Sequence, residues 1–136
     1  MLTLLPYLNR KLLPELVNEF IDDLSVSKDR SQATLNEYTS DIRLFLRYMV
    51  SVEKGLASPD ELPDDYDLSY LDRDFFNSVT LRNVNNFLTY CKNDRKIEAR
   101  GRMRKASALR GLFKYLSVKM TARGFFSHLA VKKNQN

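Results

Sequence analysis

The chain has 136 residues, a length that suits one compact domain. Its composition, 43% hydrophobic and 29% charged, is typical of a folded globular protein and excludes a disordered tail. No apolar run approaches the roughly 20 residues of a membrane-spanning helix, and Pro6 interrupts the apolar start, so we expect neither a membrane partner nor a signal peptide. The single cysteine, Cys91, excludes an internal disulfide and favours a reducing, cytoplasmic setting.

The net charge of +5 is distributed unevenly along the chain. Residues 1–52 carry six basic and seven acidic side chains, whereas residues 53–79 carry two basic and eight acidic ones. Residues 80–136 carry fourteen basic and two acidic side chains. This segregation predicts that the basic third of the chain faces a partner and that the acidic segment lies on a different surface.

Two amphipathic helices are predicted before residue 53. The first covers residues 12–27, with Pro14 in its first turn and apolar side chains at spacings of three and four. The second covers residues 32–52, with Ser31 as its N-cap. Its apolar stripe is Leu35, Tyr38, Ile42, Phe45, Leu46 and Met49. Its opposite, polar side is Asn36, Ser40, Arg43 and Arg47.

A long acidic connection separates these helices from two more. Gly55, Pro59 and Pro63 disfavour regular structure after residue 53, although apolar and aromatic residues predict that the connection packs on the core. A short helical turn is expected near residues 72–76. The third and fourth main helices are predicted over residues 80–93 and 102–119, with Gly101 and Gly124 marking the ends of that last region.

The most informative stretch is residues 92–123, with eleven lysines and arginines against two acids. Apolar residues recur through it at helical spacing, namely Met103, Ala106, Leu109, Phe113, Leu116 and Met120. A solubilising surface helix is one interpretation. A second interpretation is a polyanion binder, because the helix has no internal acid–base pairs and its densest cations stand where the helix dipole disfavours them. The start of the second helix, residues 31–36, offers short polar side chains that suit either capping or contacts with phosphates and bases.

No catalytic or metal-binding constellation is readable. The only histidine, His128, has no acid or nucleophile nearby in the sequence, and Cys91 lies on an apolar helix face. The acids between residues 60 and 67 lack the glycine and terminal glutamate of a common calcium loop. We therefore expect no cofactor, no bound metal and no catalysis by this chain alone.

The sequence resembles the N-terminal core-binding domain of tyrosine recombinases, the phage integrases and Xer-type proteins. The resemblance rests on Thr34-Leu-x-x-Tyr38-x-x-Asp41-Ile-x-x-Phe45 and, later, on Arg104-Lys105-x-Ser107-Ala108-Leu109-Arg110-x-x-Phe113-x-Tyr115-Leu116. It implies an all-α fold, a compact SAM-like bundle of four main helices with the long acidic connection between the second and third. It also implies that the second and fourth helices meet the major groove of double-stranded DNA, next to other protomers of the same recombinase.

Residue roles follow from the resemblance by position. The implied DNA contacts are Ser31, Thr34, Asn36, Ser40, Arg43, Arg100, Arg102, Arg104 and Lys105. The implied core residues are Tyr38, Phe45, Leu109, Phe113 and Leu116. Asp41 and Arg110 are expected either to pair with each other between the helices or to touch DNA. We also expect that replacing Arg104 and Lys105 together with alanine weakens DNA binding with little effect on the melting temperature.

The family's catalytic set, two arginines, a lysine, histidines and a tyrosine nucleophile, lies in a C-terminal domain of such recombinases and has no counterpart here. The resemblance thus implies a DNA-binding domain over residues 1–130, followed at residues 131–136 by a tail or the start of a linker to an absent catalytic domain. The alternative function is a helical protein-interaction module that docks its basic face on an acidic partner.

Overall fold

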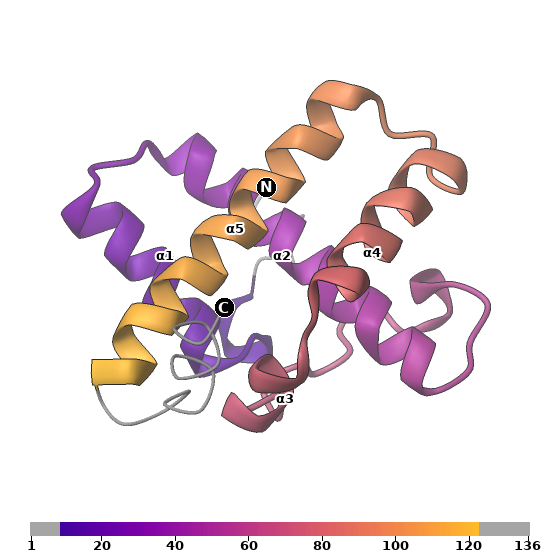
Figure 1. The fold of residues 1–136 in the computed structure, drawn as a ribbon, viewed down its shortest axis with the longest axis horizontal. Helices are drawn as coiled ribbons and strands as arrows, with labels where there is room; N and C mark the ends of the chain where they lie inside the picture. Colours follow the sequence, from indigo (N-terminus) through magenta and orange to yellow (C-terminus); the bar gives the residue numbers. More distant parts are fainter. Residues whose placement is uncertain (1–8, 123–136) are drawn as a thin grey trace, which may run out of the picture.

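A computed structural model describes the backbone of residues 9–122 and the side chains of residues 9–119. Figure 1 shows that this part of the chain is all-helical, as the sequence predicts. Its elements are η3 (Arg10–Leu12), α1 (Glu15–Ser27), α2 (Gln32–Glu53), η4 (Pro59–Glu61), α3 (Arg73–Ser78), α4 (Leu81–Asn93) and α5 (Ala99–Ala122), of which η3 and η4 are 3-10 helices. Within residues 9–122, no helix is both long and apolar enough to cross a membrane.

The helix boundaries depart from the sequence prediction at two places. Helix α1 begins at Glu15 because Pro14 has an extended backbone and acts as the N-cap residue, so residues 12–14 precede the helix. Helix α5 begins at Ala99, so Gly101 lies inside the helix and does not mark its end. A Cβ atom on Gly101 would stand 2.7 Å from the Cγ2 atom of Ile97. The glycine therefore allows the residues before α5 to pack tightly against its first turn.

The long helix α5 crosses α2, with α1 on one side and α4 on the other (Figure 1). The first turns of α2 and α5 lie at the same, upper edge of this view. Phe45 of α2 lies at the centre of the packing, because its ring meets those of Phe87 in α4 and Phe113 in α5 edge-on. The distances between ring centres are 5.3 Å to Phe87 and 6.5 Å to Phe113. Such aromatic pairs add to the stabilisation from burial alone.

The predicted core is largely confirmed. Phe45, Leu109 and Leu116 are buried, and Tyr38 and Phe113 are partly buried against the same cluster. Met103 is the exception, since 68% of its surface is exposed although its spacing placed it on the apolar face. The buried face of α5 is instead formed by Lys105, Ala108, Leu109, Leu112 and Leu116, so the buried stripe begins with a charged residue.

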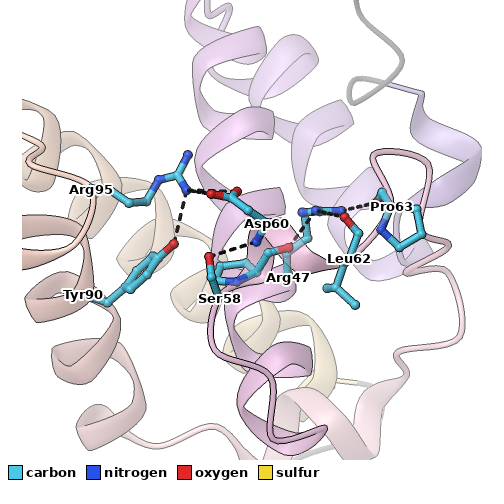
Figure 2. Close-up of polar contacts among 8 residues, drawn as sticks. Arg47, Ser58, Asp60, Leu62, Pro63, Tyr90 and Arg95 are labelled. Carbon is cyan, nitrogen blue, oxygen red and sulfur yellow. Dashed lines mark hydrogen bonds and ion pairs between the residues drawn. The ribbon is translucent and has the colours of Figure 1, made fainter.

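The acidic segment is tied to the bundle by two arginines of α2, and Figure 2 shows one of them, Arg47. Arg47, expected on the polar outer side, is only 4% exposed and donates hydrogen bonds to three backbone carbonyls. These acceptors are Pro59 at 2.9 Å, Leu62 at 2.9 Å and Pro63 at 2.7 Å. Arg43 donates to the carbonyl of Asp64 at 2.6 Å. The polar side of α2 is therefore partly an internal surface that holds the segment in place.

A second tie joins the acidic segment to the end of α4. The Nη1 atom of Arg95 lies 3.2 Å from a carboxylate oxygen of Asp60 and also donates to the hydroxyl of Tyr90 (Figure 2). Farther along the segment, Leu68, Leu71 and Phe76 are buried in the core. The expected helical turn near residues 72–76 is present as α3, one residue later at its start. The segment thus packs down as the sequence predicts.

Candidate nucleic-acid interface

The first turns of α5 hold the cations that the sequence singled out. Arg100 is exposed, and Arg102 is half-buried with its Nη1 atom donating to the carbonyl of Ile97 at 2.6 Å. The first turn contains no acidic residue, so these cations stand at the positive end of the helix dipole, with Glu98 just before the helix as the nearest acid in the sequence. Nearby phosphates would relieve that unfavourable arrangement.

Arg104 and Lys105 are held by a buried carboxylate of α2. Arg104 forks onto Asp41 through its Nε and Nη2 atoms, both at 2.8 Å, and the Nζ atom of Lys105 lies 2.8 Å from the same carboxylate. Asp41 is 1% exposed and Lys105 is 7% exposed, so this cluster links α2 to α5 inside the protein. The hydrogen bonds to Asp41 raise the pKa of Arg104, which therefore stays charged.

This cluster changes two of the expectations drawn from the sequence. The pairing of Asp41 with Arg110 is wrong, because Asp41 is bonded to Arg104 and Lys105, and Arg110 is exposed on α5. The expectation that joint loss of Arg104 and Lys105 has little effect on the melting temperature is revised to a clear decrease, because Lys105 is bonded to Asp41 inside the protein. That double substitution would leave the carboxylate of Asp41 buried without its partners, which is strongly destabilising. Lys105 is better placed to position Asp41 and Arg104 than to reach a ligand.

The polar start of α2 serves first as a cap. Ser31 accepts a hydrogen bond from the backbone N–H of Thr34 at 3.2 Å, and its hydroxyl donates to the Thr34 side chain at 3.1 Å. The capping interpretation of these residues is therefore confirmed. Ser31 is exposed and Thr34 is half-exposed, so contact with a ligand at the same edge stays a prediction.

The remaining α2 candidates do not all lie with Arg104. Arg43 follows Asp41 by two residues and so points to roughly the opposite side of the helix, where it bonds the acidic segment. Asn36 accepts a hydrogen bond from Gln32 at 2.9 Å and lines a hollow between α1 and α2. Ser40 is half-buried. Asn36 and Arg43 thus bond to parts of the chain other than α5, whereas the first turns of α2 and α5 lie at the same edge of Figure 1.

The structure also reveals an outward row on α5, of which only Arg100 belongs to the expected contact set. Its exposed members recur at spacings of three and four and are Arg100, Met103, Ser107, Arg110 and Lys114. The helical spacing was visible in the sequence. That spacing predicted the apolar face of the helix, however, and Met103 was assigned to this face although it is exposed. The cations of this row form no ion pair within the described residues, unlike Arg104.

Two grooves flank α5, and they differ in charge. One lies toward α4, is lined mainly by apolar residues including Leu81, Val84 and Leu88, and holds Arg110 as its one cation. The other lies toward α1 and has a volume of about 560 Å³. Its charged lining residues are Lys28, Arg30, Arg110, Lys114 and Lys119, with Asp23 as the one acid. The second groove is the more suitable surface for an anion.

The described residues offer little for cofactor or metal chemistry. They contain no group of three or more potential metal ligands close enough to hold an ion. Cys91 is buried, and burial raises the pKa of its thiol, so it is a packing residue and not a nucleophile. His128 lies outside the described residues, as does the segment 131–136.

Comparison with known proteins supports the resemblance. Residues 17–61 match the family model described as phage integrase, N-terminal SAM-like domain. This stretch of the chain is therefore similar to a phage integrase SAM-like domain. It is also 33% identical over 103 residues to a protein named tyrosine recombinase XerC from Caldanaerobacter subterraneus subsp. tengcongensis. That match covers 76% of this chain and 29% of the relative, so the chain spans under a third of the relative's length. No solved structure matches the chain significantly.

Proposed function

We propose that this chain is the DNA-binding core-binding domain of a site-specific tyrosine recombinase. The observation that supports the proposal most directly is the arrangement of α2 and α5, whose first turns share one edge and present Arg100, Arg102 and Arg104 with no acid in the first turn of α5. Arginine forks onto phosphate oxygens or onto guanine, and helix starts accept anions. Of the contacts implied by the resemblance, we propose Ser31, Thr34, Ser40, Arg100, Arg102 and Arg104. Lys105 has a positioning role, and Asn36 and Arg43 are held by other partners.

In this proposal the domain spans residues 1–130 and grips one side of the recombination site. A further domain of the parent protein, joined after residues 131–136, performs strand cleavage and rejoining. The present chain then binds DNA without cutting it, alongside other protomers on the same DNA and in the cytoplasm. The XerC name of the similar protein and the family of residues 17–61 support this assignment.

Asp41 gives the proposed interface its geometry. The two hydrogen bonds that Asp41 accepts from Arg104 fix the plane of the guanidinium. The Nη1 atom of Arg104 lies 3.8 Å from a carboxylate oxygen of Glu37, which is an exposed and weak partner. A phosphate can therefore replace Glu37 at little cost. The guanidinium is pre-oriented, so less side-chain entropy is lost on binding than for an unrestrained arginine.

DNA binding by the full 136-residue chain is expected to fall steeply with salt. The logarithm of the association constant falls linearly with the logarithm of the salt concentration, and each phosphate contact contributes about 0.9 to this slope. If about five phosphates are neutralised, the association constant should drop roughly 500-fold between 50 and 200 mM salt. Fluorescence anisotropy with a labelled 25-bp duplex of mixed sequence measures this slope. Binding without any salt dependence would contradict the proposal and favour the protein-interaction module.

Replacing Arg100 and Arg102 together with glutamine is expected to reduce that slope by about 2, since two phosphate contacts are lost. The matched control replaces Arg82 and Lys92 on α4, which removes the same charge from exposed positions away from the proposed interface. Both variants should keep the melting temperature of the parent chain. Equal reductions in the two variants would show that net charge alone governs binding.

A further inference from the structure

The groove between α1 and α5 is enclosed by cations on both sides. Lys28 and Arg30 stand on the corner between α1 and α2, and Arg110, Lys114 and Lys119 stand on α5. Between them lie apolar and aromatic residues, namely Phe20, Leu24, Tyr38, Tyr115 and Val118. A concave surface with positive rims and weakly polar walls strengthens the field felt by an anion inside it.

The cations at the rims are available for a ligand. Lys28, Arg30, Arg110 and Lys114 form no ion pair within the described residues, and all four are exposed. The one acid of the groove, Asp23, accepts a hydrogen bond from Ser27 at 3.0 Å. Lys119 lies 5.8 Å from the ring centre of Tyr115 and forms no ion pair with the residues that the structure describes. Five positive charges therefore face one negative charge across a space of about 560 Å³.

The walls of the groove are held by close packing. Gly111 lets α1 approach α5, because a Cβ atom there would stand 3.3 Å from the Cζ atom of Phe20. At the corner, the backbone of Asp29 adopts a positive φ of 52°, between the two cations Lys28 and Arg30. The N–H of Arg30 donates to the carbonyl of Leu24 at 3.2 Å, which closes the corner onto the end of α1. The position of both cations is thus determined by the backbone.

The length of α5 relates this groove to the proposed major-groove contact. The major groove of B-DNA is about 12 Å wide, and a helix advances about 1.5 Å per residue. A helix with Arg102 in the groove would thus reach the flanking sugar–phosphate backbone about eight residues later, near Arg110. Lys114 follows one turn beyond. The outward row of α5 therefore leads from the first turns directly into the cationic groove.

We propose that the groove formed by the α1–α2 corner and the second half of α5 binds the DNA backbone that flanks the major groove occupied by the first turns of α2 and α5. Lys28, Arg30 and Lys114 contact phosphates. Arg110 lies where α5 leaves the major groove and meets the sugar–phosphate backbone. This inference rests on the proposed DNA-binding function and adds to it a second contact surface. The surface supplies affinity and register without reading bases.

The test uses the full chain and a labelled 25-bp duplex of mixed sequence. The variant Lys28→Gln, Arg30→Gln, Lys114→Gln should lower the logarithmic salt slope by nearly 3 and weaken binding on the order of a hundredfold at 0.1 M salt. The control Lys54→Gln, Arg82→Gln, Lys92→Gln removes the same charge from exposed residues outside the groove and should change the slope by less than about 1. Melting temperatures establish that both variants are folded.

A charge-retaining variant, Lys28→Arg, Arg30→Lys, Lys114→Arg, should keep the parent slope and so separates charge from shape. Equal losses in the groove variant and its control would overturn the inference. The proposed function would survive that result if the Arg100→Gln, Arg102→Gln variant still lowered the slope. Absence of salt-dependent binding by the parent chain would overturn both.

Discussion

Replacing Asp41 with alanine is expected to lower the free energy of unfolding by about 3–5 kcal/mol, among the largest effects of any single substitution in this chain. The substitution removes the carboxylate that pairs with the Lys105 ammonium, whose side chain is 9% exposed. Arg104 can turn toward water because 38% of its side chain is exposed, whereas Lys105 stays enclosed. The cost therefore arises mainly from a buried, uncompensated ammonium. Urea denaturation monitored by circular dichroism measures it.

The matched control restores an uncharged interior. Combining Asp41→Leu with Lys105→Met removes both buried charges and keeps most of the volume, so it should recover most of the stability lost in Asp41→Ala. A cycle with each single substitution gives the coupling energy between the two residues. A loss below about 1 kcal/mol for Asp41→Ala would mean that Lys105 finds solvent or another partner when the carboxylate is absent. DNA binding by the double variant should still weaken, because Arg104 loses its fixed orientation.

Much of the fold could be predicted from local chemistry. Ser31 caps the helix that the sequence assigned to it, and Thr80 caps α4 in a full capping box with Asn83. Spacings of three and four identified the buried stripe of α2. The start of α5 could not be placed in the same way, because glycine is a helix breaker by propensity. Here the missing Cβ of Gly101 leaves room for the Ile97 side chain inside the helix start.

The candidate site was predicted less completely, for a physical reason. Lys105 and Arg47 are indistinguishable in sequence from surface cations, and only the packing of distant segments reveals that each is buried with its own acceptors. Asp41 is 64 residues from Lys105, so no local spacing links them. Lys28 and Arg30 were overlooked because an isolated pair of cations in a turn carries no helical periodicity. Their importance comes from lying opposite α5.

Replacing Arg47 with methionine should lower the free energy of unfolding by about 3–5 kcal/mol, because three backbone carbonyls lose a charged donor and two of them, those of Pro59 and Leu62, are buried. Methionine retains much of the aliphatic stem, so the loss reports hydrogen bonding more than a cavity. Burial lowers the pKa of Arg47, with Asp64 and Asp60 opposing that effect, which agrees with a guanidinium held in a weakly hydrated site. Thermal and urea denaturation measure the change.

The effect should also be local, since Arg47 holds the acidic segment to α2. Amide hydrogen exchange of residues 57–66 should accelerate in Arg47→Met more than exchange in α4 or α5. Arg43→Met is the matched control: it lies one turn earlier, bonds the carbonyl of Asp64 and is more exposed, so a loss under about 1 kcal/mol is expected. Similar losses from both substitutions would mean that general charge attraction to the acidic segment, and not the three carbonyls, anchors it. An unchanged exchange rate at residues 57–66 would place the stabilisation elsewhere in the bundle.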